Sequence, residues 1–396
     1  MPKSGDELSV LGFGCMRLPI KDKKIDEARA IGLIRSAVDQ GVNYLDTAWP
    51  YHAGESEIVL GKALQDGYRS RVKVATKLPS WMIKTREDMD RYLAAQLAKL
   101  KTDHIDYYLL HSLNGAAWDN LERLGALEFL EQAKRDGRIV NAGFSFHGLG
   151  PEFIRIVDAY PWCFCQIQYS YLDEKYQAGT AGLEHAAAKG LGVIIMEPLR
   201  GGSLALATPP PAVEAIWKEA KVRRTPAEWA LRWIWNRPEV TVILSGMSDE
   251  AQVRENLSLA STALPNALSR EELDLVKRVG QTYQSLMKVG CTGCGYCMPC
   301  PSEVMIPICF EEYNKLHLFG GLDDAKFRYA FRMSGDLVDG RPGYASQCVQ
   351  CGTCADQCPQ QIPIPDMLAQ VAAELEGPDL MDRVVAARKI FKIEAP

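Results

Sequence analysis

Eight short apolar segments alternate with helix-like segments over the first 260 residues. Several helix-like segments end at a glycine, as at Gly41, Gly137 and Gly190, where glycine makes the left-handed turn without steric cost. Alternation of strand and helix favours parallel pairing, and eight units predict an α/β fold, a closed (β/α)8 or TIM barrel. A doubly wound open sheet is the alternative, but it usually has fewer strands and a glycine-rich first turn. The expected strands are Val10–Gly14, Val42–Leu45, Val72–Thr76, Ile105–Leu110, Ile139–Phe144, Phe164–Ile167, Gly192–Met196 and Thr241–Leu244.

Polar residues stand at or just after the carboxyl end of each expected strand. In a barrel this is the face that carries the chemistry. One histidine or lysine there is more often a core or surface residue than a catalyst, but several acid and base types on one rim favour a site. The residues are Arg17, Asp46, Lys77, His111, Ser145, Gln166, Glu197 and Ser245.

The pair Asp46 and Tyr51 is the first of these features along the chain. Asp46 ends a buried strand, and Tyr51 follows it on the next loop. A carboxylate can hold a cationic partner in a recessed site, and a tyrosine can deliver a proton. We expect this loop to be the centre of the site.

Four of these residues, in this order and spacing, resemble the catalytic tetrad of the aldo-keto reductase superfamily: Asp46, Tyr51, Lys77 and His111. The resemblance covers about residues 8–260. Further matches are Gly54–Glu57 after the tyrosine, Gln166–Ser170 at the carboxamide-binding strand, Thr225–Trp233, and the adenine-binding pair Glu255 and Asn256. The variants at Gly143–His147 and Met196–Gly202 resemble the branch that carries a C-terminal iron–sulfur domain.

The resemblance implies hydride transfer to a carbonyl carbon from a nicotinamide, NADH or NADPH. Tyr51 would be the proton donor, because a neighbouring Lys77 ammonium lowers the pKa of a phenol that otherwise titrates near about 10. Asp46 would balance the ammonium, and His111 would polarise the carbonyl. The cofactor-binding residues would be Arg17, Ser145, Gln166, Met196, Glu197, Leu199, Ser245, Gly246, Glu255 and Asn256.

The expected cofactor site departs from the family at three places. Met196 stands where the family usually stacks a tyrosine on the nicotinamide, and Phe146 replaces its asparagine. No charged group stands at Gly246, Met247 or Gln252, where the family grips a 2′-phosphate, so an arginine clamp for NADP is not evident.

The C-terminal region carries eight of the twelve cysteines in two runs. The second run has the bacterial ferredoxin spacing for [4Fe–4S] ligation, and the first differs by one residue in its last gap. In two-cluster ferredoxins the fourth cysteine of one run serves the other cluster. That pattern groups Cys291, Cys294, Cys297 and Cys358 as one set, and Cys348, Cys351, Cys354 and Cys300 as the other. Exchanged fourth ligands stay open, and a pair of zinc sites is the alternative.

Helical signals surround these runs. Ser269 and Glu272 have the spacing of a capping box. Helices are expected near Glu311–Leu318, Asp323–Arg332, Pro365–Glu376 and Asp379–Lys392. We therefore expect a barrel domain over residues 1–265 and a mainly helical dicluster ferredoxin-like domain over 266–396.

Charge and composition exclude several classes. The net charge is −5 without a long basic run, which predicts no nucleic-acid binding. The start has no apolar signal region and no run is long enough to span a bilayer, so we expect a cytoplasmic protein. In a chain without an export signal, clustered cysteines favour metal binding over disulfide bonds.

These features predict an oxidoreductase that acts on a carbonyl or a related unsaturated or quinoid small molecule, with electrons linked to two [4Fe–4S] clusters. A hydride carries two electrons and a cluster passes one, so a converter such as a flavin is a further candidate cofactor. A ferredoxin-like protein is a candidate electron-transfer partner. Two alternatives remain: a nicotinamide-dependent reductase with structural clusters, and a redox-sensing or electron-transfer subunit with a non-catalytic barrel.

Overall fold

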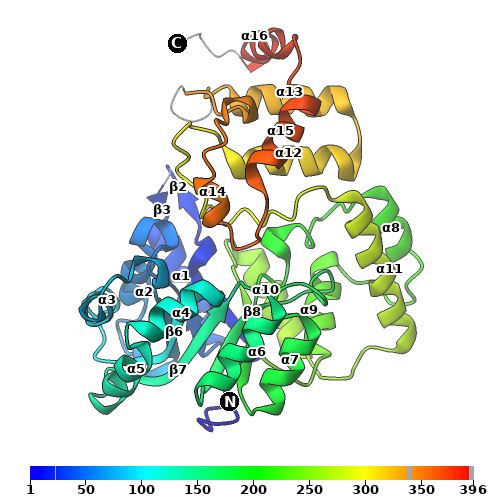
Figure 1. Ribbon diagram of the computed structural model, residues 1–396. Coiled ribbons are helices and arrows are strands. Elements are labelled where there is room, and N and C mark those ends of the chain that lie inside the picture. Colours follow the sequence, from blue (N-terminus) through cyan, green and yellow to red (C-terminus); the bar gives the residue numbers. More distant parts are fainter. Residues whose placement is uncertain (23, 337–340, 392–396) are drawn as a thin grey trace. The chain divides into compact units, whose positions relative to one another are not determined.

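The computed structural model describes residues 1–22, 24–336 and 341–391 (Figure 1). The chain forms two compact units. The first comprises Met1–Leu199 and Arg224–Leu273, and the second comprises Arg200–Arg223 and Asp274–Pro396. The segment Arg200–Arg223, which lies between barrel elements in the sequence, therefore groups with the cysteine-bearing unit. The boundary expected at residue 265 falls shortly before the helix α11, Arg270–Leu286.

The first unit is a closed barrel of eight parallel strands in the order β1-β10-β9-β8-β7-β6-β5-β4 (Figure 1). This confirms the predicted fold. The strands are β1 Leu11–Gly14, β4 Tyr44–Asp46, β5 Lys73–Leu78, β6 Ile105–Leu113, β7 Ile139–Phe146, β8 Phe164–Gln168, β9 Gly192–Met196 and β10 Val240–Ser245.

Six of these strands end further along the chain than their apolar pattern predicted: β4, β5, β6, β7, β8 and β10. β5 continues to Leu78 and β6 to Leu113, so Lys77 and His111 lie inside strands and not after them. Strand assignment from apolar runs stops at the first polar residue, although a backbone ladder continues through buried polar side chains. The short antiparallel pair β2 Ile20–Lys21 and β3 Lys24–Ile25 was not predicted, because two-residue strands leave no readable period.

Helices follow the strands in alternation. In the first unit they are α1 Glu27–Asp39, α2 Ser56–Ala63, α3 Arg86–Leu100, α4 Gly115–Arg123, α5 Ala126–Arg135, α6 Gly150–Ala159, α7 Gly179–Ala188, α9 Pro226–Trp235 and α10 Glu250–Ala260. Short 3-10 helices are η1 Cys15–Arg17, η2 Tyr51–Gly54, η3 Arg69–Arg71 and η4 Ser80–Met82. A capping box precedes α3, in which Asp88 accepts from the backbone N–H of Thr85.

The interior of the barrel is a packed core. Tyr44, Tyr107 and Phe164 are fully buried and meet edge to face, with ring centroids 5.5 Å and 5.1 Å apart. Such aromatic pairs add to the free energy already gained by burying their area. Because side chains fill the barrel at this level, small molecules can reach only the polar residues nearer the carboxyl ends of the strands.

The second unit is helical. Its helices are α8 Pro211–Trp217, most of α11, α12 Ile306–Phe319, α13 Leu322–Met333, α14 Thr353–Asp356, α15 Ile364–Leu375 and α16 Leu380–Phe391, with the 3-10 helices η5 Arg200–Gly202 and η6 Ala345–Gln347. The four helices expected here are confirmed over the described residues; Lys392 lies outside them. The capping box before α11 is also present, with Ser269 and Glu272 bonded reciprocally. No helix in the described ranges is both long and apolar enough to cross a membrane.

We predict opposite effects for alanine at two helical glycines. A Cβ at Gly61 in α2 would lie 2.4 Å from the Lys99 carbonyl oxygen in α3, and backbone cannot move aside easily. A Cβ at Gly32 in α1 would meet no atom within 4 Å. Gly61→Ala should therefore lower the free energy of unfolding by about 1–3 kcal/mol. Gly32→Ala should raise it by up to about 1 kcal/mol. Denaturant titrations of both variants check this, and a destabilised Gly32→Ala would contradict it.

Candidate functional site

A buried lysine organises the carboxyl end of the barrel. Lys77 Nζ donates to Asp46 Oδ1 at 2.7 Å, to the Thr47 carbonyl at 2.8 Å and to the Tyr51 hydroxyl at 3.4 Å. These three acceptors match the three N–H donors of an ammonium group. The side chains of Lys77 and Asp46 are only 1% and 3% exposed, and Tyr51 is buried.

Burial acts on both partners of this ion pair. It lowers the pKa of Lys77 and raises the pKa of Asp46 from their usual values, while the attraction between the two groups opposes both changes. The short contact and the two further acceptors favour the charged pair, because a buried ammonium is tolerated only when its N–H groups are paired.

A network of buried polar side chains holds the strands that carry the pair. Glu57 in α2 accepts from Thr76 in β5 at 2.7 Å and from Gln96 in α3 at 2.8 Å. Gln96 also donates to the Lys77 carbonyl at 2.9 Å. This network fixes the backbone on which Lys77 stands. In the sequence, Glu57 appeared only as part of the segment Gly54–Glu57. Gln96 gave no signal, since the hydrogen-bond partners of its side chain come from three different elements.

The loop after β4 is held from a second side. Lys99 Nζ lies 3.7 Å from the centroid of the Trp49 ring and donates to the Gly54 carbonyl at 3.1 Å. His52 and Ala53 adopt left-handed backbone, with φ of 51° and 54°. Non-glycine residues rarely adopt this conformation, and such strain persists only where the surroundings enforce it. Tyr51 is thus presented by a loop with little freedom.

His111 lies beside the tyrosine. Its ring centroid is 6.1 Å from that of Tyr51 and 5.2 Å from that of the half-exposed Trp81. Burial lowers the pKa of His111 well below its usual range, and the positive charge of Lys77 lowers it further. The imidazole is therefore neutral near neutral pH and has one N–H to donate.

The structure brings the expected cofactor residues together in small groups. Gln166 Nε2 lies 3.7 Å from Met196 Sδ across β8 and β9. Arg17 pairs with Glu197 at 3.4 Å, and its side chain packs on Gly246, where a Cβ would lie 3.1 Å from it. Leu199 follows Glu197 and is half-buried.

The other expected cofactor residues make contacts within the protein. Ser245 accepts from the Asn256 amide at 2.9 Å, and both side chains are buried. Glu255 accepts from Thr225 at 2.7 Å. Ser145 accepts from the backbone N–H of Ser112 at 2.7 Å, which ties β7 to the end of β6.

One atom of this group fits a nicotinamide. Gln166 is 1% exposed, and its Oε1 has no hydrogen-bond partner among the residues that the structure describes. A buried amide oxygen without a donor costs free energy, so it marks a place where a ligand N–H fits. A carboxamide supplies such a donor.

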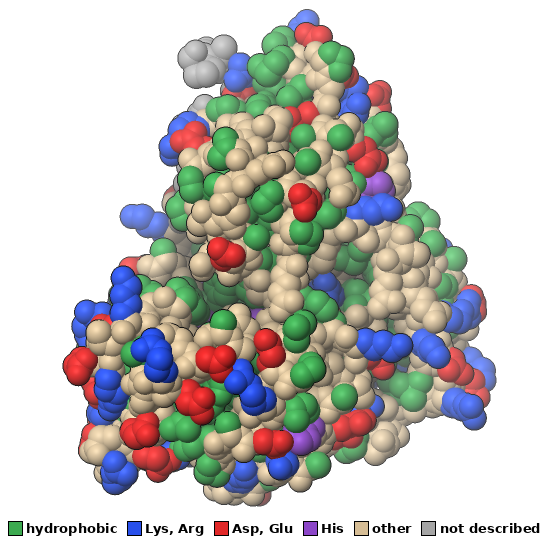
Figure 2. Space-filling model, in the orientation of Figure 1, with side chains coloured by type: hydrophobic (Ala, Val, Ile, Leu, Met, Phe, Trp, Pro, Cys, Tyr) green, Lys and Arg blue, Asp and Glu red, His purple; other side chains and the backbone are tan. Residues whose placement is uncertain are grey.

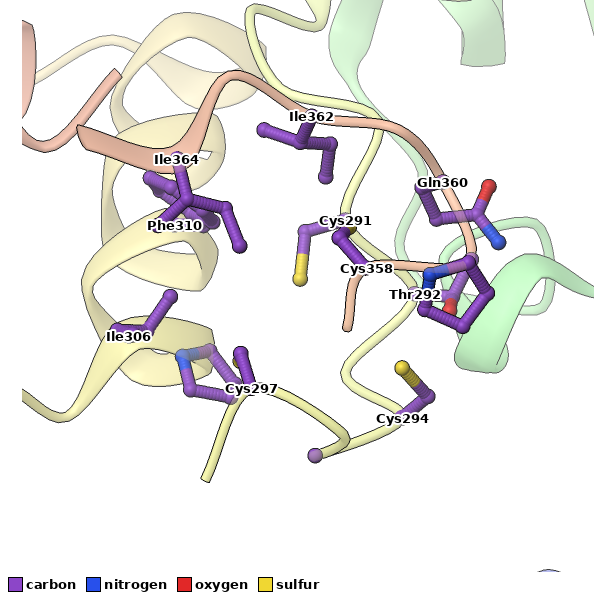
Figure 3. A pocket seen from close by; sticks show the side chains of 13 residues that line it. Cys291, Thr292, Cys294, Cys297, Ile306, Phe310, Cys358, Gln360, Ile362 and Ile364 are labelled. Atoms are coloured by element: carbon purple, nitrogen blue, oxygen red, sulfur yellow. The ribbon is translucent and has the colours of Figure 1, made fainter. Parts of the chain in front are cut away.

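The first set of cysteines lines one cavity of the second unit. Cys291, Cys294, Cys297 and Cys358 line this cavity together. Figure 3 shows the sulfurs of Cys291 and Cys294 pointing into this space, which Ile306, Phe310, Ile362 and Ile364 also border. Burial, together with the charges of the three other thiols, raises the pKa of Cys297 to about 12.

The second set also lies together. Burial raises the pKa of Cys354, and the neighbouring Cys348, Cys300 and Cys351 raise it further. Both groupings agree with the exchanged fourth ligand of two-cluster ferredoxins. Among the described residues, no three His, Cys, Asp or Glu side chains converge on a single ion. Sulfurs that ligate the corners of a cubane surround a larger volume than an ion occupies, so the two observations are compatible.

Comparison with known proteins agrees with this geometry. The Aldo/keto reductase family matches residues 10–277, and the 4Fe-4S dicluster domain matches residues 290–362. The first match covers more than half of the chain, and the chain belongs to the aldo/keto reductase family. It is an oxidoreductase with a C-terminal iron–sulfur domain.

Relatives align with the barrel. The uncharacterized oxidoreductase YqkF of Bacillus subtilis is 26% identical over 312 residues, which cover 71% of this chain and 95% of the relative. L-galactose dehydrogenase of Arabidopsis thaliana is 27% identical over 305 residues, covering 72% and 94%. The holo form of an aldo-keto reductase from Bacillus halodurans superposes with a TM-score of 0.59 at 25% identity, covering 70% of this chain and 94% of that one. An aldo-keto reductase from Klebsiella pneumoniae in complex with NADPH shares the fold, with a TM-score of 0.57, 23% identity, and coverage of 69% and 91%.

Removing one partner of the buried ion pair should be costly. Asp46→Asn leaves the Lys77 ammonium buried without its carboxylate, and such a loss costs about 3–5 kcal/mol. The double variant Asp46→Asn with Lys77→Met removes both charges and should recover a large part of this loss. Denaturant titrations followed by tryptophan fluorescence measure the cycle. A double variant no more stable than Asp46→Asn would show that the two groups are not coupled.

The buried histidines predict an acid dependence of stability. Burial lowers the pKa of His147 to about 4, while its hydrogen bond with Gln177 opposes the change. An unfolded histidine titrates near about 6.5, so below that pH the unfolded chain binds protons that folded His147 and His111 do not. The contribution of these histidines to the free energy of unfolding is therefore fully present above about pH 6.5. It falls as the pH drops, by up to about 1.4 kcal/mol per pH unit for each histidine.

Replacement of either histidine should flatten this dependence. Unfolding of His111→Gln and His147→Gln by denaturant, from about pH 7.5 down to about pH 5.5, measures the slope. An unchanged slope in both variants would contradict the assignment of neutral, buried imidazoles.

Proposed function

We propose that this chain reduces a carbonyl, or a related unsaturated or quinoid small molecule, with Tyr51 as the proton donor and with electrons linked to two [4Fe–4S] clusters. One observation carries the catalytic part: Lys77 donates at once to Asp46, to the Thr47 carbonyl and to the Tyr51 hydroxyl. Because the tyrosine oxygen accepts from the ammonium, its own proton can be donated to another oxygen.

The proton transfer follows from this arrangement. When Tyr51 gives its proton to the substrate oxygen, the Lys77 ammonium stabilises the phenolate that remains. Asp46 keeps Lys77 charged and in place. In the reverse direction the phenolate accepts the proton of an alcohol, so the same groups serve oxidation.

His111 supplies orientation. As a neutral imidazole it can donate one hydrogen bond to a carbonyl oxygen. In this role it does not take up a proton during the reaction. Its ring lies edge to face with that of Tyr51. A substrate oxygen placed between the two side chains would receive a hydrogen bond from one and a proton from the other.

A nicotinamide bound at the rim supplies the hydride. Gln166 is the residue whose orphaned amide oxygen fits the carboxamide, and Met196 would border the ring. Arg17, held by Glu197 and Gly246, would meet the phosphates, with Ser145, Leu199, Ser245, Glu255 and Asn256 completing the site. The family membership of the chain supports this assignment.

A flavin is the alternative cofactor. A flavin can exchange either two electrons or one at a time. A link between hydride transfer and the clusters requires both of these abilities. Met196, where a stacking tyrosine is absent, leaves the ring site without an aromatic partner for nicotinamide. NAD and NADP are not distinguished, because no cationic group replaces the usual 2′-phosphate contacts.

The two sets of four cysteines would each hold one [4Fe–4S] cluster, which supplies single electrons. The grouping of the thiols around separate sites and the match of the dicluster domain support this. A purely structural role is the second candidate. It is favoured by the packing of Cys291, Cys297, Cys300, Cys348 and Cys358 against the apolar core of the helical unit.

We predict that Tyr51→Phe lowers turnover about 100- to 10,000-fold, the usual range for a lost general acid. The assay is reduction of a panel of aldehydes, ketones and quinones, with reduced nicotinamide or reduced ferredoxin as the electron source. Tyr68→Phe is the matched control, since the Tyr68 hydroxyl donates to the exposed carboxylate of Asp39. Unchanged turnover in Tyr51→Phe would remove the proton-donor assignment and would favour a sensing role for the barrel.

A further inference from the structure

Ser145 is a polar side chain in the interior of the barrel unit. Over the outer surface of the barrel helices, charged side chains of both signs are mixed (Figure 2), and water solvates them there. Ser145 in β7 is instead only 1% exposed. A buried hydroxyl is normally paired with another polar group. The Ser145 oxygen accepts from the backbone N–H of Ser112 at 2.7 Å, so its partner is a backbone group of β6.

β6 carries an extra residue where it meets Ser145. The register between β6 and β7 shifts between Leu110 and Leu113. Over this stretch two residues of β6, His111 and Ser112, face one residue of β7, Ser145. Such a β-bulge bends its strand and changes the direction of a side chain, and bulges are frequent beside active sites.

The backbone at this bulge is strained. Ser112 has a φ of 57°, in the left-handed region that favours glycine. A serine stays in that region only where its surroundings enforce it. The hydrogen bond to Ser145 is such a restraint, because it satisfies the N–H of Ser112 in this conformation. The left-handed backbone of Ser112 therefore depends on the hydroxyl of Ser145.

The restrained N–H belongs to the peptide unit that joins His111 to Ser112. A peptide unit is planar, so a bond that holds its N–H also holds the carbonyl carbon attached to His111 Cα. The direction of the His111 side chain follows from this backbone. Its ring centroid lies 6.1 Å from that of Tyr51, and a misplacement of about 1 Å at such a site can cost about 100-fold in rate.

We propose that Ser145 is a positioning residue, which holds the left-handed backbone of Ser112 and thereby aims the imidazole of His111 at the substrate oxygen. The inference rests on the proposed function, in which His111 donates a hydrogen bond to that oxygen. A hydroxyl oxygen that accepts from an N–H keeps its own hydrogen for another acceptor. Ser145 can therefore hold the bulge and donate to a bound carboxamide at the same time.

The first test observes His111 without any substrate. NMR of protein labelled with nitrogen-15 in its histidine rings, near neutral pH and with oxidised clusters, gives ring signals that depend on tautomer and hydrogen bonding. His111→Gln assigns the signals of His111. We expect Ser145→Ala to move them. Ser112→Gly in the same background should return them toward their parent positions, because glycine adopts left-handed backbone without strain.

Thr241→Val is the matched control. Thr241 Oγ1 accepts from the backbone N–H of Val193 at 3.1 Å, so this variant also removes a hydroxyl that joins two barrel strands. Both residues lie near the amino ends of their strands, β10 and β9, and not at the carboxyl ends that carry the site. Thr241→Val should therefore leave the His111 signals and the turnover at their parent values. Denaturant titrations check that each variant is folded in the assay.

The second test is steady-state reduction of a carbonyl compound that the parent protein accepts, with reduced nicotinamide or reduced ferredoxin as the electron source. Ser145→Ala should lower kcat about 100-fold. Ser112→Gly in the same background should recover a large part of this loss.

Ser112→Val acts on the same bond from β6. A β-branched residue disfavours left-handed backbone, so kcat should fall and the His111 signals should move. The hydroxyl of Ser145 is retained in this variant, so the affinity for nicotinamide, measured by titration, should match that of the parent protein. Should Ser145→Ala fail to fold, Ser112→Val answers the same question.

Two results would overturn the inference. One is a Ser145→Ala variant in which the His111 signals and kcat keep their parent values. The other is a loss in Ser145→Ala that Ser112→Gly does not recover, since the hydroxyl would then act through the cofactor alone. Retained turnover in Tyr51→Phe would instead contradict the proposed function, and the His111 signals would still report on Ser145. The two failures are therefore distinguishable.

Discussion

The buried contact between Lys77 and Asp46 is the interaction on which the site depends. A lysine in the interior of a barrel is costly, and three acceptors offset that cost. The same contacts place the Tyr51 hydroxyl oxygen beside the ammonium, so one arrangement both stabilises the barrel end and holds the hydroxyl that we propose as the proton donor. The network of Glu57, Gln96 and Thr76 then keeps the lysine strand in register with its neighbours.

Much of this arrangement could be predicted from the sequence. The alternation of strands and helices predicted the barrel. The residues at the strand ends predicted which side chains meet at one end of it, because parallel strands bring their carboxyl ends to one face. The Lys77–Asp46–Tyr51 contacts agree with that expectation. Cysteine spacing gave the two groups of thiols. The rest depended on side-chain packing. Within α3, Gln96 contacts the Lys77 carbonyl and Lys99 contacts the loop of Tyr51, and no pattern in the sequence indicates either contact.

The proposed link between carbonyl reduction and the iron–sulfur clusters depends on how many electrons each of them transfers. A hydride carries two electrons, and the two clusters that we propose would hold the same number together if each took one. In the proposed function, the tetrad, the cofactor rim and the clusters belong to one oxidoreductase of the aldo/keto reductase family that exchanges single electrons with a partner.

The most direct test of this account is the charge of Lys77 in the folded protein. Nitrogen-15 NMR of protein labelled at lysine Nζ, at near-neutral pH and with oxidised clusters, observes it. The account predicts an ammonium resonance that exchanges slowly with water, since its N–H groups are buried and paired, and that disappears in Lys77→Met. A neutral amine resonance assigned to Lys77 by the same variant would contradict the account, because an uncharged lysine could neither balance Asp46 nor stabilise the phenolate of Tyr51.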